Sequence, residues 1–104
     1  MGESWLEPDV SVQWPDQRRT SKYFIGAPMI AIEILSPREN TDDKVTTYLD
    51  NGAAEVWVLD RKHRRMTVCV RRGDEVIRRV EYGEYRSETT GVLILLPQIF
   101  GVKP

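Results

Sequence analysis

The hydrophobic positions along the chain change from an alternating to a continuous pattern, and this change marks the predicted elements. Val10, Val12 and Trp14 alternate with polar residues, which predicts a short strand with one exposed face. Residues 29–35 form an almost continuous apolar run, and residues 54–60 form a second run of the buried type. Continuous runs of this length are typical of strands that are covered on both faces.

The segment between these two runs predicts a helix over residues 39–51. Val45, Tyr48 and Leu49 stand at positions i, i+3 and i+4, which gives the helix one apolar stripe. Gly52 follows the helix and can adopt the left-handed conformation that often ends one. Strand, helix and strand in this order make a crossover unit, so the two flanking strands are expected to be parallel neighbours.

The C-terminal half of the sequence predicts further strands. Residues 66–70 and 75–80 flank Arg72-Gly73-Asp74, which is typical of a hairpin turn. A last apolar segment, residues 92–96, is followed by one short helical turn at residues 97–100. The expected fold is therefore α/β, with one crossover helix, a C-terminal antiparallel hairpin and a mixed sheet that is mostly antiparallel.

Length and composition predict one small domain over residues 1–104. The chain is 40% hydrophobic and 30% charged, which is ordinary for a globular protein but allows only a thin core. A homodimer that buries further area is therefore a plausible hypothesis. No apolar stretch approaches the roughly 20 residues of a membrane helix. The only cysteine, Cys69, fits a small strand side chain, and together these features favour a cytoplasmic location.

The small net charge of −1 conceals an asymmetry along the chain. Residues 1–60 contain 5 basic and 11 acidic residues, whereas residues 61–79 contain 8 basic and 2 acidic residues. An acidic part suits a cation and a basic hairpin suits a phosphate backbone. Solvated arginines that protect an exposed strand edge are an equally good explanation of the basic segment.

Three residues suggest chemistry. Glu33 lies within an apolar strand, where a carboxylate is unfavourable unless it has a partner or a metal ion. Asp9 precedes the first predicted strand, and Lys44 lies beside the apolar stripe of the helix. If the first strand pairs with the strand that carries Glu33, two carboxylates can reach one point and can hold Mg²⁺ or Mn²⁺. Taken alone, Asp9 fits a turn residue and Lys44 a solvated side chain.

Several motifs in this order resemble the Uma-type family of putative restriction endonucleases, a bacterial family within the PD-(D/E)XK nuclease superfamily. The matching segments are Glu7-Pro8-Asp9-Val10-Ser11-Val12, Ala31-Ile32-Glu33-Ile34-Leu35-Ser36-Pro37, Lys44-Val45-Thr46-Thr47-Tyr48-Leu49, Gly52-Ala53-Ala54-Glu55-Val56-Trp57-Val58-Leu59-Asp60 and the closing residues 90–100. The resemblance extends from about residue 5 to residue 100, and it implies a restriction endonuclease-like fold.

The resemblance also implies roles for the candidate residues. Asp9 and Glu33 would be the metal ligands, and Mg²⁺ or Mn²⁺ would be the cofactor. The lysine of a standard Glu-x-Lys motif would stand at position 35, which is Leu35 here. The resemblance therefore points to Lys44, on the following helix, as the catalytic lysine. Tyr48 would pack the helix on the sheet. Family members usually carry a helix and a hairpin before the Pro-Asp motif, so the chain is expected to be an N-terminally short form.

The leading hypothesis is a metal-dependent endonuclease that hydrolyses DNA, with Arg64, Arg65, Arg71 and Arg72 contacting phosphates. Two alternatives stay open. The chain could be a non-catalytic remnant of the fold that dimerises or binds a partner, or a module that binds nucleic acid without hydrolysis. His63, in a polar turn, is a weak candidate for a general base because no partner is predicted beside it. Asp60 is expected to form a turn at its strand end.

Overall fold

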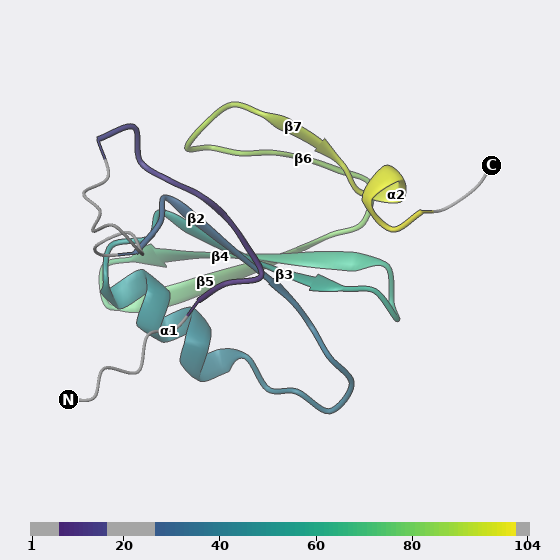
Figure 1. Ribbon diagram of the computed structural model, residues 1–104, viewed down its shortest axis with the longest axis horizontal. Helices are drawn as coiled ribbons and strands as arrows, with labels where there is room; N and C mark the ends of the chain where they lie inside the picture. Colours follow the sequence, from purple (N-terminus) through teal and green to yellow (C-terminus); the bar gives the residue numbers. More distant parts are fainter. Residues whose placement is uncertain (1–6, 17–26, 102–104) are drawn as a thin grey trace.

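Five strands form one mixed sheet in the order β1-β2-β3-β4-β5 (Figure 1). The computed structural model describes residues 7–16 and 27–101 of the chain. Only β2 and β3 run parallel, and the other three neighbouring pairs are antiparallel. The expected parallel pair and the expected hairpin are both confirmed. The strands are β1 (Val10–Val12), β2 (Ile30–Ile34), β3 (Glu55–Asp60), β4 (Arg65–Arg72) and β5 (Glu75–Glu81).

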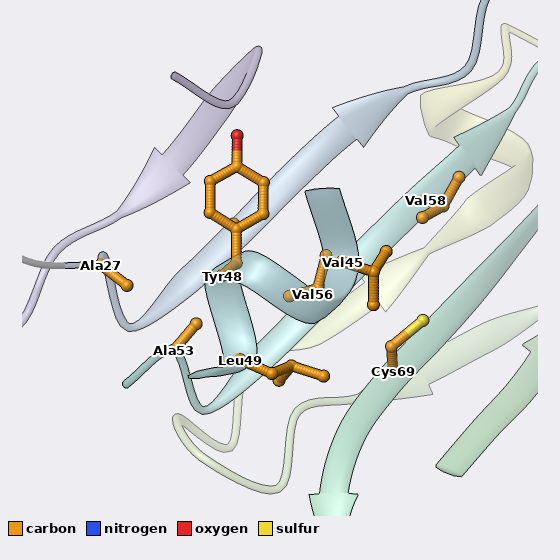
Figure 2. Close-up of a cluster of buried hydrophobic side chains, with 9 residues drawn as sticks. Ala27, Val45, Tyr48, Leu49, Ala53, Val56, Val58 and Cys69 are labelled. Atoms are coloured by element: carbon orange, nitrogen blue, oxygen red, sulfur yellow. The ribbon is translucent and has the colours of Figure 1, made fainter. Parts of the chain in front are cut away.

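The helix α1 (Asp42–Asp50) connects the two parallel strands and covers one face of the sheet (Figure 1). Its apolar stripe is buried as predicted: Val45 and Leu49 pack with Val56 of β3 and Cys69 of β4 (Figure 2). Burial raises the pKa of the Cys69 thiol, which agrees with a packing role for this residue. The crossover therefore holds the first turn of α1 above the end of β2.

The opposite face of the sheet is covered by a small C-terminal unit (Figure 1). It consists of β6 (Glu84–Arg86), β7 (Leu93–Leu95) and the short helix α2 (Leu96–Ile99), and the two strands pair in an antiparallel manner. Tyr85 and Leu96 are buried against Trp57, and the rings of Tyr85 and Trp57 meet edge to face with centroids 5.8 Å apart. β7 and α2 agree with the sequence analysis, which did not predict β6.

A buried glutamate joins this C-terminal unit to the sheet. Glu55, at the start of β3, is 1% exposed and accepts hydrogen bonds from the Trp57 indole at 2.8 Å and the Tyr85 hydroxyl at 2.7 Å. Its second oxygen accepts from the Ser87 hydroxyl at 2.6 Å and the Thr89 amide at 3.1 Å. Burial acts to raise the pKa of Glu55, but these hydrogen bonds outweigh it and lower the pKa. Glu55 is therefore a structural carboxylate.

Candidate active site

The two predicted carboxylates lie side by side at the end of the sheet where β2 ends. The antiparallel register pairs Val10 with Ile32, so one further step places Asp9 opposite Glu33. Asp9 Oδ2 accepts a hydrogen bond from the Ile34 amide at 2.7 Å, which fixes this carboxylate beside the end of β2. The pairing of the two strands therefore brings together two residues that are 24 positions apart in the sequence.

Glu33 points to the face of the sheet that α1 covers. Side chains alternate along β2, and Ala31 of the same strand belongs to the core beneath the helix. Glu33 is only 3% exposed, and its Oε2 accepts a hydrogen bond from the Tyr48 hydroxyl at 2.9 Å. Burial and then this bond raise the pKa of Tyr48 far above its usual range, so Tyr48 remains a hydrogen-bond donor. Tyr48 thus packs the helix, as predicted, and also orients Glu33.

Lys44 approaches the other oxygen of Glu33 from the first turn of α1. Its Nζ lies 3.5 Å from Glu33 Oε1 and 3.1 Å from Glu39 Oε2. Glu39 is itself held by the Ser36 amide at 3.0 Å. The hydrogen bond to Glu39 and then the charge of Glu33 raise the pKa of Lys44. The ammonium group therefore stays charged at neutral pH and can donate a proton or a hydrogen bond, but it cannot act as a base.

The donor set fits a hard divalent cation that retains most of its water. Within residues 7–16 and 27–101, no group of three or more His, Cys, Asp and Glu side chains could hold a metal ion by itself. Asp9 and Glu33 offer two carboxylates, and Mg²⁺ commonly binds one or two carboxylates together with waters and substrate phosphates. Cations that need a complete cage of protein ligands fit this pair poorly.

The four arginines proposed for phosphate contact are separated by the structure. Arg64 and Arg65 lie at the β3–β4 turn, at the end of the sheet that carries Glu33. Arg71 and Arg72 lie at the opposite end of β4. The eight residues of β4 span about 23 Å at 3.3 Å per residue. The two pairs therefore cannot contact the same phosphate.

Three of these arginines have acidic partners. Arg71 pairs with Asp50 at the C-terminal end of α1, and Arg72 pairs with Glu88 at 3.2 Å. Arg65 Nε lies 3.5 Å from Asp60 Oδ2. These pairs favour the interpretation in which much of the basic segment is solvated surface. The strand register makes the β3–β4 turn the basic part nearest to the carboxylates.

His63 has a partner that the sequence analysis did not predict. Its Nδ1 lies 2.8 Å from Asp60 Oδ2, and its amide donates to Asp60 Oδ1 at 3.1 Å. The amide contact confirms the turn-forming role expected of Asp60, and the ring contact corrects the expectation that His63 stands alone. Burial acts to raise the pKa of Asp60, but the His63 bonds and the charges of His63 and Arg65 lower it.

Sequence reasoning missed two parts of the site. Glu39 was not singled out, although it binds Lys44 more closely than Glu33 does. The hydrogen bond of Tyr48 to Glu33 was also missed, because Tyr48 was interpreted only as a packing residue. The one signal available was the spacing of Lys44 and Tyr48 by a single helical turn, which places both side chains on one helix face.

The mixed α/β fold resembles that of a solved structure. A crystal structure of a putative nuclease of the DUF820 family from Anabaena variabilis ATCC 29413 superposes with a TM-score of 0.70 at 20% sequence identity. The alignment covers 90% of this chain and 59% of that chain, so the present chain spans about three fifths of the length of that protein.

The chain belongs to the Uma2 family, described as putative restriction endonucleases, whose family model matches residues 2–101. This membership confirms the resemblance seen in the sequence motifs. No curated protein matches the chain at a significant level. Among the described residues, no helix is long and apolar enough to cross a membrane.

Proposed function

We propose that this chain is a divalent-metal-dependent endonuclease domain that hydrolyses phosphodiester bonds of DNA. The observation that carries the proposal is the juxtaposition of Asp9, Glu33 and Lys44 at the end of β2. Family membership adds support, because the family is described as putative restriction endonucleases. The metal would be Mg²⁺ or Mn²⁺, held by the Asp9 and Glu33 carboxylates.

Each residue would have a distinct task in hydrolysis. A bound divalent cation would polarise a phosphate oxygen and lower the pKa of a nearby water. Tyr48 keeps Glu33 oriented through one oxygen, and the Ile34 amide does the same for Asp9. Lys44, which remains charged, would donate a hydrogen bond to the water or to the phosphate as negative charge develops there.

The proposal is tested by Mn²⁺ titration calorimetry and by a plasmid cleavage assay. Glu33→Gln keeps the size of the side chain and removes its charge, so we expect it to abolish Mn²⁺ binding and Mn²⁺-dependent cleavage. Asp74→Asn removes a carboxylate from the β4–β5 turn, at the end of the sheet opposite to Glu33, and should change neither measurement. Cleavage that survives in Glu33→Gln, or wild-type protein that binds no Mn²⁺, would overturn the proposed metal site.

A non-catalytic partner-binding module is the second candidate function. The observation that favours it is a group of exposed apolar residues on and beside β7 and α2, namely Val92, Leu93, Leu95 and Ile99, which are 41–53% exposed. Such a surface is typical of a protein interface. Analytical ultracentrifugation tests the homodimer form of this candidate, because a clean monomer at micromolar concentration would contradict a homodimer built on this surface.

A further inference from the structure

A surface pocket of about 400 Å³ lies next to the carboxylate pair. Two short segments line it: residues 35–39, which begin the connection from β2 to α1, and residues 60–63, which lead into the β3–β4 turn. Glu39 lines the pocket and also binds Lys44 at 3.1 Å, so Lys44 connects a pocket residue to Glu33. Ligand sites commonly have volumes of about 300–1,000 Å³, so this pocket falls within the usual range and has room for one nucleotide unit.

The acidic groups of this pocket are already compensated. Glu39 pairs with Lys44, and Asp60 is bonded to the His63 ring at 2.8 Å and faces Arg65 at 3.5 Å. The pKa of Glu39 is lowered, first by the backbone amide of Ser36 and then by Lys44, so this carboxylate stays ionised and engaged. Neither acid therefore has to be neutralised by a bound ligand.

The basic groups of the pocket, in contrast, have no side-chain partner among the described residues. Arg38, Arg61 and Lys62 line it, and none of the three forms a hydrogen bond or ion pair within the described part of the chain. Three cationic side chains that converge on one pocket with their donors free are suited to an anion. Arginine in particular matches the oxygens of a phosphate with two parallel hydrogen bonds.

The backbone of the two lining segments supplies an independent observation. Arg38 (φ 67°) and Arg64 (φ 51°) are the non-glycine residues with positive φ within residues 7–16 and 27–101. One belongs to the first lining segment, and the other directly follows the second. An L-residue in this conformation is strained, and such strain persists where the fold holds a residue in place, often at binding sites. Both strained positions carry arginine, and both lie at the end of the sheet that carries Glu33.

We propose that this pocket binds a backbone phosphate of the nucleic-acid strand, next to the phosphate that lies at the carboxylate pair. Arg38, Arg61 and Lys62 would bind the phosphate oxygens, and the attached sugar would pack against Leu35 and Pro37. The inference deepens the proposed nuclease function and rests on it for the identity of the ligand. It assigns binding of the nucleic-acid strand to residues other than those that would hydrolyse the phosphodiester bond.

The test is DNA binding without divalent metal, measured by fluorescence anisotropy with a short labelled oligonucleotide over a series of salt concentrations. The double variant Arg61→Ala/Lys62→Ala should raise the Kd about tenfold. It should also reduce the slope of log Kd against log salt by about one, as expected for the loss of one phosphate contact. The control is Arg78→Ala/Arg79→Ala, which removes the same charge from the exposed strand β5. An equal loss in both variants, or none in the pocket variant, would overturn the inference.

A single variant separates binding from folding. Arg38→Gly removes a pocket cation and also relieves the strained backbone, because glycine adopts positive φ without a steric penalty. We expect weaker DNA binding together with a thermal unfolding midpoint that is equal to or higher than that of the wild type. Unchanged DNA binding in this variant would remove Arg38 from the proposed site.

Two further measurements separate this inference from the proposed function. Inorganic phosphate, added at constant ionic strength, should compete poorly with the oligonucleotide, because it lacks the sugar. Competition at equal phosphate concentration would show a site for free anions and would overturn the assignment to a nucleic-acid strand. Wild-type protein that cleaves no DNA but still binds it through Arg61 and Lys62 would contradict the hydrolytic function and leave the binding site standing.

Discussion

The Tyr48 hydroxyl donates a hydrogen bond of 2.9 Å to Glu33, and this contact ties the helix α1 to the end of β2. Tyr48 is 3% exposed and also belongs to the core between the helix and the sheet (Figure 2). The same side chain therefore packs the crossover and orients the proposed metal ligand. Stability and site geometry are coupled through this one residue.

Tyr48→Phe is expected to lower the free energy of unfolding by about 1–3 kcal/mol, because a buried carboxylate oxygen loses its donor. Urea unfolding measures this change. If Glu33 binds metal, Mn²⁺ should stabilise the variant more than it stabilises the wild type, since the cation replaces the missing donor. Tyr82→Phe, at a tyrosine that is 62% exposed, is the control and should change stability by less than about 0.5 kcal/mol. Equal effects of the two substitutions would contradict the coupling.

Lys44→Gln should separate the lysine from the metal ligands. We expect kcat for DNA cleavage to fall about 100- to 1,000-fold, as is usual for the loss of a donor to developing charge. Mn²⁺ affinity should be unchanged or higher, because a positive charge 3.5 Å from Glu33 is removed. Arg79→Gln, on the exposed strand β5, is the matched control for the lost charge. Loss of Mn²⁺ binding in Lys44→Gln would show instead that the lysine holds the site together.

Glu55 should make the stability depend on acidic pH. Its pKa in the folded protein is below the ordinary value of 4.5, so its contribution is complete above pH 4.5 and is lost as the pH falls through the lowered pKa. Glu55→Gln should therefore destabilise the protein most at neutral pH and progressively less below pH 4.5. Urea unfolding of both proteins between pH 3 and pH 7 gives the difference. Glu84→Gln, on an exposed side chain of β6, should show a constant difference near zero.

Leu95 and Leu96 provide a matched pair for the C-terminal unit. Leu96 is fully buried between α2 and the sheet, whereas Leu95 is 41% exposed. Leu96→Ala is expected to lower the free energy of unfolding by about 2–5 kcal/mol, and Leu95→Ala by about 1 kcal/mol or less. Chemical denaturation followed by tryptophan fluorescence measures both, because Trp57 lies in the same cluster. Similar values for the two variants would contradict the assignment of this cluster as core.

The sequence predicted those parts of the fold that local patterns control. The runs that became β2 and β3 and the stripe of α1 were recognisable because each element buries a regular set of apolar residues. β6 was not recognisable, since it has three residues and only Tyr85 among them is buried. The helix begins at Asp42 rather than residue 39, because the Asn40 side chain accepts a hydrogen bond from the Asp42 amide at 2.9 Å and so turns the chain into the helix at this point.

Three charged members of the candidate site could be predicted from the sequence. Asp9, Glu33 and Lys44 stood out as polar residues at informative positions, and the structure brings them together. The pocket depends on how two loops meet, which no local pattern specifies. Glu39 was missed although its contacts with Ser36 and Lys44 are local, because it was interpreted as the first residue of the helix. The partner of His63 was missed for a different reason, because Asp60 was interpreted mainly as a turn residue and no contact with the His63 ring was considered.

The edge strand β1 gives the proposed site a thermodynamic consequence of its own. β1 has three residues, all exposed, and among the described strands it pairs with β2 alone, yet it positions Asp9. Release of this strand would separate the two carboxylates while the core around α1 stayed folded. The measured affinity for any ligand that bridges Asp9 and Glu33 therefore includes the free energy of docking β1. Such a ligand would in turn protect the amide of Ile34 from hydrogen exchange, which makes a single backbone amide a reporter of site assembly.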